Sequence, residues 1–128
     1  MKKYLIIILR LALAGFLFQT LYFKFAAHPD SVYIFTKIGM EPYGRIGIGV
    51  MELIASIMLL IPRTVWAGAV LAVGILAGAI LMHLTLLGID VQGDGGGLFY
   101  TGILLLVLAL VIAWFYRKAI PILGAKFK

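Results

Sequence analysis

Cysteine is absent from the 128-residue chain. Thiol redox relays, disulfide exchange, thiolate metal sites and iron–sulfur clusters all need cysteine sulfur, so the sequence excludes these chemistries. Histidine is scarce as well: only His28 and His83 are present, and their positions match no zinc-ligand spacing. A haem would need both as axial ligands, and His28 is expected beyond the end of a membrane span. We therefore predict no metal site.

Charged residues are also few: they make up 12% of the chain, whereas 64% of the residues are hydrophobic. A soluble domain of this size could not bury so much apolar surface. A helix needs about 20 apolar residues to cross the hydrocarbon core. The sequence predicts an all-α, integral membrane four-helix bundle that forms a single transmembrane domain over residues 1–128 and leaves no room for a separate soluble catalytic unit. The predicted spans are residues 4–25, 44–61, 65–88 and 98–116.

The formal net charge is +6, and its placement predicts an orientation. If both termini are cytoplasmic, the outer side keeps mainly Lys24, Lys37 and Arg45, and the positive-inside rule favours this arrangement. Topology and anionic lipid headgroups explain the basic ends, so we expect the lipid bilayer and no nucleic acid as a partner. We predict a multi-pass protein of the plasma or inner membrane. The basic residues of the predicted cytoplasmic side are Lys2, Lys3, Arg63, Arg117, Lys118, Lys126 and Lys128.

Arg10 interrupts the apolar run that follows Lys2 and Lys3, which argues against a cleaved secretory signal. We interpret this run as the first span and expect Arg10 to reach the cytoplasmic headgroups.

The loop between the first two spans begins Pro29-Asp30-Ser31 and continues with apolar residues, which predicts a short helix with Asp30 or Ser31 as its N-cap. Two interpretations stay open. The helix lies flat on the outer membrane surface as a lid, or it is a simple ordered connector.

The third span is rich in small residues, which let helix backbones approach closely in lipid. Gly68, Ala72 and Ala79 lie near one side, while Gly74 and Gly78 form a G-x-x-x-G pair on another. We therefore expect this span to be central in the bundle. The glycine pair fits an internal contact and a homo-oligomer equally well. The fourth span has no ionisable residue and is interpreted as a lipid-facing wall.

Glu52 lies near the middle of the apolar run 46–61, so a carboxylate is expected within the bilayer. Such a group costs roughly 2.5 kcal/mol or more on insertion scales and normally faces a partner, a ligand or water. Counted along their spans at about 1.5 Å per residue, Gln19, Arg45, Glu52 and His83 all fall in the outer half of the membrane. The sequence therefore predicts a polar, outward-facing pocket.

Helical periodicity of about 100° per residue tests which side chains share a face. Arg45, Glu52 and Ser56 follow one face of the second span, and a face of the third ends at His83. Gln19 and Lys24 point roughly 140° apart, so only one of them approaches Glu52, and Thr20 shares a side with Lys24. The candidate ligand-binding residues are Glu52, Lys24, His83, Gln19, Arg45 and Ser56, with loop contributions from Asp94 and His28.

Each candidate also has a structural interpretation. Glu52 can be half of an ion pair with Lys24 or Arg45, because buried charges are usually paired. Lys24 and Arg45 can extend to the headgroups, Gln19 can join helices, and His83 can satisfy a buried hydrogen bond.

Several short segments follow one another in a fixed order along nearly the whole chain: Gly15 to Lys24-Phe25, Pro29, residues 35–42 with Gly39, Gly49-Val50-Met51-Glu52-Leu53 with Leu59-Leu60, and Gly88 to Phe99 with Asp94-Gly95-Gly96-Gly97. Together they resemble the DoxX family of small four-helix membrane proteins. The resemblance implies a compact four-helix bundle with Lys24 and Glu52 at the usual polar positions of the family. It also implies links to quinone-dependent sulfur oxidation or to oxidative-stress complexes for some members.

Two functional hypotheses follow. The first is a non-catalytic membrane module that binds a lipid-like molecule or a partner protein through the outer pocket. The second is a quinone-interacting subunit of an oxidoreductase complex, in which Glu52 or His83 exchanges protons. The chain has no flavin motif, so the second hypothesis needs another redox protein. We predict no resident cofactor and leave a quinone open as an alternative. The sequence favours a non-catalytic role for the isolated chain but does not decide whether it is an enzyme. A transporter has little support without a discontinuous helix pair.

Overall fold

The computed structural model describes residues 2–26, 29–41, 43–89 and 95–119, and within them every regular element is helical. Four of the helices are long and apolar enough to cross a membrane, which confirms the predicted all-α four-helix architecture. The observed ends differ from the predicted ones by only a few residues, apart from a change of helix type at the end of the third span. The main helices are α1 (Lys2–Phe25), α2 (Pro29–Lys37), α3 (Tyr43–Leu60), α4 (Val65–Met82) and α5 (Gly97–Phe115).

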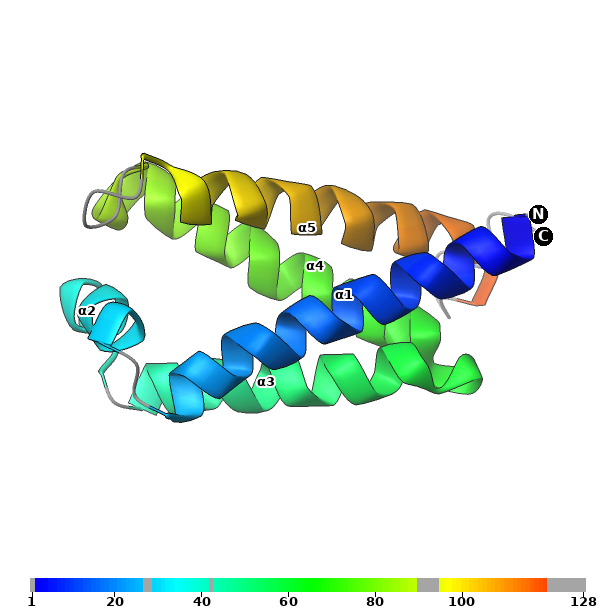
Figure 1. The fold of residues 1–128 in the computed structure, drawn as a ribbon, viewed down its shortest axis with the longest axis horizontal. Helices are drawn as coiled ribbons and strands as arrows, with labels where there is room; N and C mark the ends of the chain where they lie inside the picture. Colours follow the sequence, from blue (N-terminus) through cyan, green and yellow to red (C-terminus); the bar gives the residue numbers. More distant parts are fainter. Residues whose placement is uncertain (1, 27–28, 42, 90–94, 120–128) are drawn as a thin grey trace.

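The four long helices form two antiparallel pairs (Figure 1). α1 packs along α3, and α4 packs along α5, while α3 and α4 meet beside the tight turn η1 (Pro62–Thr64). The pairs converge where α1 begins and α5 ends, and they diverge toward α2 (Figure 1). We call the converging end the packed half and the diverging end the open half. Among the described residues, each long helix packs mainly against two other long helices, α4 against α3 and α5. α4 is therefore no more central than the others, and the prediction of a central third span is wrong.

The hydrophobic core fills the packed half and ends where the pairs separate. Its residues come from all four long helices, and many of them are fully buried. The core consists of Ile6, Leu13, Ala14, Leu17, Ala55, Leu59, Val65, Ala69, Ala72, Leu76, Leu105, Ala109 and Ile112. Because the core lies at one end, apolar packing alone does not hold the other end together.

Small residues on α4 have two different roles. A Cβ added to Gly68 would lie 2.9 Å from the carbonyl oxygen of Ala55 and 2.9 Å from the amide nitrogen of Leu59. Gly68 therefore permits the close approach of α3 and α4 that small residues allow in membranes. A Cβ on Gly74 or Gly78 would meet nothing within 4 Å. The G-x-x-x-G pair therefore makes no close helix contact among the described residues.

Arg10 of α1 binds the C-terminal end of α3. Its Nε donates to the carbonyl oxygen of Leu59 at 2.9 Å, and its Nη2 donates to that of Leu60 at 3.3 Å. The last carbonyls of a helix lack partners within the helix and carry partial negative charge, so a guanidinium stabilises them. Arg10 therefore joins α1 to the end of α3, and its reach to the headgroups stays a prediction.

The short helix α2 lies between the diverging ends of the two pairs (Figure 1). It begins at Pro29, a residue favoured at the first helical position, so Asp30 and Ser31 lie inside its first turn and neither is its N-cap. After the helix, Gly39 adopts φ 78°, and the amides of Gly39 and Met40 donate back to the carbonyls of Thr36 and Phe35 at 3.1 and 2.8 Å. This Schellman arrangement gives α2 a defined end.

Candidate functional site

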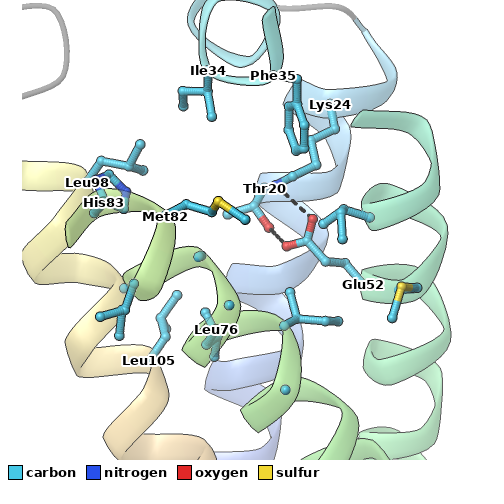
Figure 2. A pocket seen from close by; sticks show the side chains of 18 of the residues that line it. Thr20, Lys24, Ile34, Phe35, Glu52, Leu76, Met82, His83, Leu98 and Leu105 are labelled. Atoms are coloured by element: carbon cyan, nitrogen blue, oxygen red, sulfur yellow. Dashed lines mark hydrogen bonds and ion pairs between the residues drawn. The ribbon is translucent and has the colours of Figure 1, made fainter. Parts of the chain in front are cut away.

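A cavity of about 550 Å³ lies between the two helix pairs in the open half. All four long helices line it, and α2 contributes Ile34 and Phe35 on the side away from the core (Figure 2). Leu76 and Leu105 belong both to the core and to the cavity wall, so the packed half forms the floor. Most of the lining is apolar. The polar lining residues are Thr20, Lys24, Ser31, Glu52, His83 and Thr101.

Glu52 is held on the wall of this cavity by two residues of α1 (Figure 2). The Lys24 Nζ lies 2.8 Å from Glu52 Oε1, and the hydroxyl of Thr20 donates to Glu52 Oε2. The side chain of Glu52 is only 4% exposed, which explains why it needs a cationic partner. Thr20 and Lys24 are four residues apart and therefore share one face of α1. Of the two partners considered for Glu52, the structure selects Lys24 and not Arg45.

Arg45 is buried at the end of the α1–α3 pair that lies in the open half. Its Nε lies 2.9 and 3.0 Å from the two carboxylate oxygens of Glu41, and its Nη1 donates to the backbone carbonyl of Lys24 near the end of α1. This is again a contact between an arginine and a helix C-terminus. Arg45 is not among the described residues that line the cavity, so its role there is to join α3 to α1.

Ser56 is fully buried and donates to the backbone carbonyl of Glu52 at 2.8 Å, one helical turn earlier. It does not belong to the described cavity lining. Its hydroxyl is therefore satisfied within α3, as is common for serine inside helices.

Gln19 lies on the outer face of α1, beside a shallow hollow formed with Leu11, Ala12, Gly15 and Phe16. It is absent from the described cavity lining, and this corrects its inclusion among the pocket residues. The cause is the angular separation already noted: once Lys24 faces Glu52, a residue five positions earlier faces away.

His83 lies opposite the ion pair, at the start of the π-helical turn η2 (His83–Leu87) that follows α4. Its Nδ1 is 3.0 Å from the carbonyl oxygen of Gly88, and its ring meets Phe99 edge-on at 5.6 Å. A carbonyl can only accept, so Nδ1 carries a proton, and Nε2 of the neutral ring is then an acceptor. Gly88, at φ 82°, provides a backbone conformation that other residues rarely adopt. Short π-helical turns are frequent at functional sites.

The two loop candidates, His28 and Asp94, lie outside the described residues. Within the described part of the chain, no three histidine, aspartate or glutamate side chains gather in a way that could hold a metal ion.

Some cavity residues escaped the sequence interpretation. Thr101 and Leu105 belong to α5, so the fourth span is not simply a lipid-facing wall. No ionisable residue marked that face, and a lone threonine in an apolar span carries little signal. The contribution of Thr20 could have been found, because its four-residue spacing from Lys24 places both on the side that faces Glu52.

The arrangement combines an apolar chamber with a few polar groups at its walls, which is the usual composition of a small-molecule site. An ammonium group has three donors. Among the described residues, Lys24 forms an ion pair with Glu52, which leaves further donors available to an oxygen of a ligand. In the tautomer with a proton on Nδ1 and none on Nε2, His83 would accept through Nε2 from a ligand hydroxyl or amide.

Comparison with protein families agrees with this architecture. The model of the DoxX-like family matches residues 8–115, which is most of the chain. Searches of curated proteins and of solved structures found no match. Together with the four apolar helices, the family match makes the chain a multi-pass membrane protein, while the membrane and the cytoplasmic placement of both termini stay predictions. The chain belongs to the DoxX-like family.

Proposed function

We propose that this protein is a non-catalytic membrane module that binds one lipid-like molecule in the cavity of its open half. The observation that carries the proposal is the cavity itself, about 550 Å³ in volume with a largely apolar lining. Small-molecule sites in proteins typically have volumes of roughly 300–1,000 Å³ and combine apolar walls with a few polar groups. On the predicted orientation, this site lies in the outer half of the bilayer.

The positions of the polar groups support an amphipathic ligand. Lys24, Thr20 and Glu52 gather on one wall, and His83 lies on the facing wall (Figure 2). A polar headgroup between these walls could accept from Lys24 and donate to His83. The remaining lining from α2, α4 and α5 would surround an apolar portion of the ligand. The Lys24–Glu52 pair keeps both charges compensated before a ligand arrives.

A quinone belongs to the same chemical class, since it has a polar ring with two oxygens and an apolar tail. A redox role would require electrons from another protein, and the chain itself has no cysteine. The quinone-subunit hypothesis is therefore distinguished by the identity of the bound molecule. A protein partner is the third outcome, in which the polar walls receive a side chain of that partner.

The test is extraction of the protein purified in mild detergent, with mass spectrometry of the molecules that co-purify. We compare the wild type with Thr101→Trp, which places a large ring in the cavity, and with the matched control Ile103→Trp. Ile103 lies on the same helix, is partly exposed and is absent from the described cavity lining. We expect one lipid-like species enriched over bulk lipid in the wild type and the control, and depleted in Thr101→Trp.

Enrichment of a quinone would favour the oxidoreductase hypothesis over a purely structural or binding role. If no small molecule is enriched and a second protein co-purifies in fixed proportion, the lipid proposal is wrong and the partner hypothesis replaces it. Equal lipid content in all three proteins would also overturn the proposal, because the recovered lipid would then not occupy the cavity.

A further inference from the structure

The cavity extends to both sides of the contact between α3 and α4. Gly68 marks the side of α4 that faces α3. At about 100° per residue, Leu76 and His83 lie roughly 60–80° to one side of Gly68, whereas Gly74 and Gly78 lie roughly 80–120° to the other. All four of these residues line the cavity. The cavity therefore passes between the two helices and does not end within the bundle.

The facing helix α3 has the same arrangement. Ala55 approaches Gly68, and relative to Ala55 the residues Glu52 and Met51 lie on opposite sides, roughly 60° and 40° away. Both line the cavity. Because α3 and α4 are antiparallel, Glu52 shares its side with His83, and Met51 shares its side with Gly74 and Gly78. Glu52 contacts α1 and His83 contacts α5, so their side is the bundle interior. The other side faces outward, toward lipid.

No side chain of α4 fills the outward slot at the two glycines. A Cβ on Gly74 or Gly78 would meet nothing within 4 Å, and both residues are exposed. Val70 and Met51, the neighbouring lining residues on the two helices, are apolar and partly exposed. The polar lining residues Glu52 of α3 and His83 of η2 both lie on the interior side. Polarity thus changes across the cavity, from polar walls inside the bundle to an apolar slot at its flank.

We propose that this slot between α3 and α4, bordered by Met51, Val70, Gly74 and Gly78, holds the apolar tail of the ligand. The inference rests on the proposed function and specifies its ligand class: a long-tailed amphipathic molecule whose headgroup lies inside the bundle while its tail emerges sideways. A tail in this position stays in an apolar medium throughout, so tail length is not limited by the cavity volume.

The glycines are the feature that makes the slot testable. In the double variant Gly74→Leu, Gly78→Leu, the new side chains occupy the slot, and the open space around both Cβ positions predicts that the bundle still folds. Leucine also has the higher helix propensity. Gly47→Leu is the matched control, because Gly47 lies on α3, a Cβ added to it would meet nothing within 4 Å, and it is outside the described cavity lining.

The experiment uses the full chain in phosphatidylcholine vesicles that contain a photoactivatable, diazirine-bearing fatty alcohol of either hexadecanol or octanol length. After illumination, mass spectrometry measures labelling of the peptides that line the cavity. We expect the wild type and Gly47→Leu to be labelled by both probes. Labelling of the double variant by the long probe should be roughly tenfold lower than that of the wild type, which corresponds to the loss of about two methylene contacts. Its labelling by the short probe should stay within twofold of the wild type, about the size of experimental scatter.

Each alternative result contradicts either the slot alone or the slot together with the proposed function. Equal long-probe labelling of the wild type and the double variant overturns the slot while the proposed function stands. Absence of cavity labelling in the wild type by both probes overturns the proposed function and the slot together. If the double variant changes the oligomeric state in light scattering and keeps its long-probe labelling, the glycines serve a contact between copies of the chain, and the slot is rejected. Thermal unfolding of each variant verifies that the bundle is intact.

Discussion

The packed half and the open half are made from the same four helices but are held together by different interactions. In the packed half, leucine, isoleucine and alanine side chains interlock around fully buried residues such as Leu59 and Ala69. In the open half, the long helices separate around a cavity of about 550 Å³. Because a well-packed interior has no space for a ligand, stability and binding are expected to reside mainly in different halves.

Polar contacts replace apolar packing in the open half. Lys24 and Thr20 join α1 to α3 through Glu52, and Arg45 joins the same helices through the carbonyl of Lys24. On the other pair, the ring of His83 contacts Phe99 edge-on and so joins the end of α4 to α5. Hydrogen bonds between membrane helices contribute on the order of 1 kcal/mol each. A few such contacts fix the helix ends while leaving the space between them free.

The largest expected effect comes from removing one charge of the open half. Glu52→Gln leaves the Lys24 ammonium without its anionic partner, and breaking a buried ion pair typically costs about 3–5 kcal/mol. We expect a loss of this size in the free energy of unfolding, measured by titration with a denaturing detergent. The result would show that polar contacts of the open half are as important for folding as the apolar core.

The control for this variant is removal of both charges. In the double variant Lys24→Met, Glu52→Gln, no uncompensated charge is left, and replacing a whole buried pair by uncharged groups is often neutral. Recovery of most of the lost stability would assign the cost to the unpaired ammonium. Unchanged stability of Glu52→Gln alone would contradict the view that the pair holds α1 to α3.

A smaller contrast is expected between two glycines of the same helix, one from each half. Gly68→Ala places a Cβ 2.9 Å from backbone atoms of α3, and overpacking of this kind costs about 1–3 kcal/mol. Gly74→Ala meets nothing within 4 Å, and an alanine is favoured over glycine in a helix by up to about 1 kcal/mol. We expect detergent titration to show destabilisation for the first variant and no loss for the second. Equal losses would mean that both halves are packed alike.

The sequence predicted the helices well because their signal is local. Apolar runs of spanning length, together with the short turn at Pro62, predicted the four long helices to within a few residues, apart from the π-helical turn η2 that ends the third span. The angular argument also identified Lys24 and Gln19 as alternatives for Glu52, and the structure selects Lys24. Each of these conclusions depends only on the composition and periodicity of one helix.

What the sequence could not supply is the spacing between helices. Arg45, Glu52 and Ser56 are all buried along α3, as predicted, but residues on one face of a helix need not line the same cavity. Arg45 bonds to Glu41, and Ser56 bonds to the backbone of its own helix. In the same way, Gly68 and Gly74 look alike in the sequence, although one meets a neighbouring backbone and the other borders a cavity. Whether such a residue contacts a neighbouring helix or lines the cavity depends on where the helix pairs diverge, and the sequence of a single helix does not determine that position.

The smallest expected effect concerns α2, the element that connects the two pairs in the open half. Phe35 is 7% exposed, and Lys37 Nζ lies 3.4 Å from the carbonyl oxygen of Leu87, so α2 contacts both the cavity and η2. Phe35→Ala should free α2 locally while the core of the packed half stays intact. Hydrogen exchange of the α2 amides should then accelerate by roughly tenfold or more, because elements with few buried contacts open independently of global unfolding.

Thr36→Ala is the control for this last variant, since Thr36 is exposed on the same helix and should leave the exchange of α2 unchanged. Amides of the packed half, such as those around Leu59, should exchange at wild-type rates in both variants. If Phe35→Ala accelerated exchange throughout the protein, the two halves would unfold as one unit and would not differ in local stability. If exchange rises only in α2, the helix is a cover that can open over the cavity while the packed half keeps the bundle assembled.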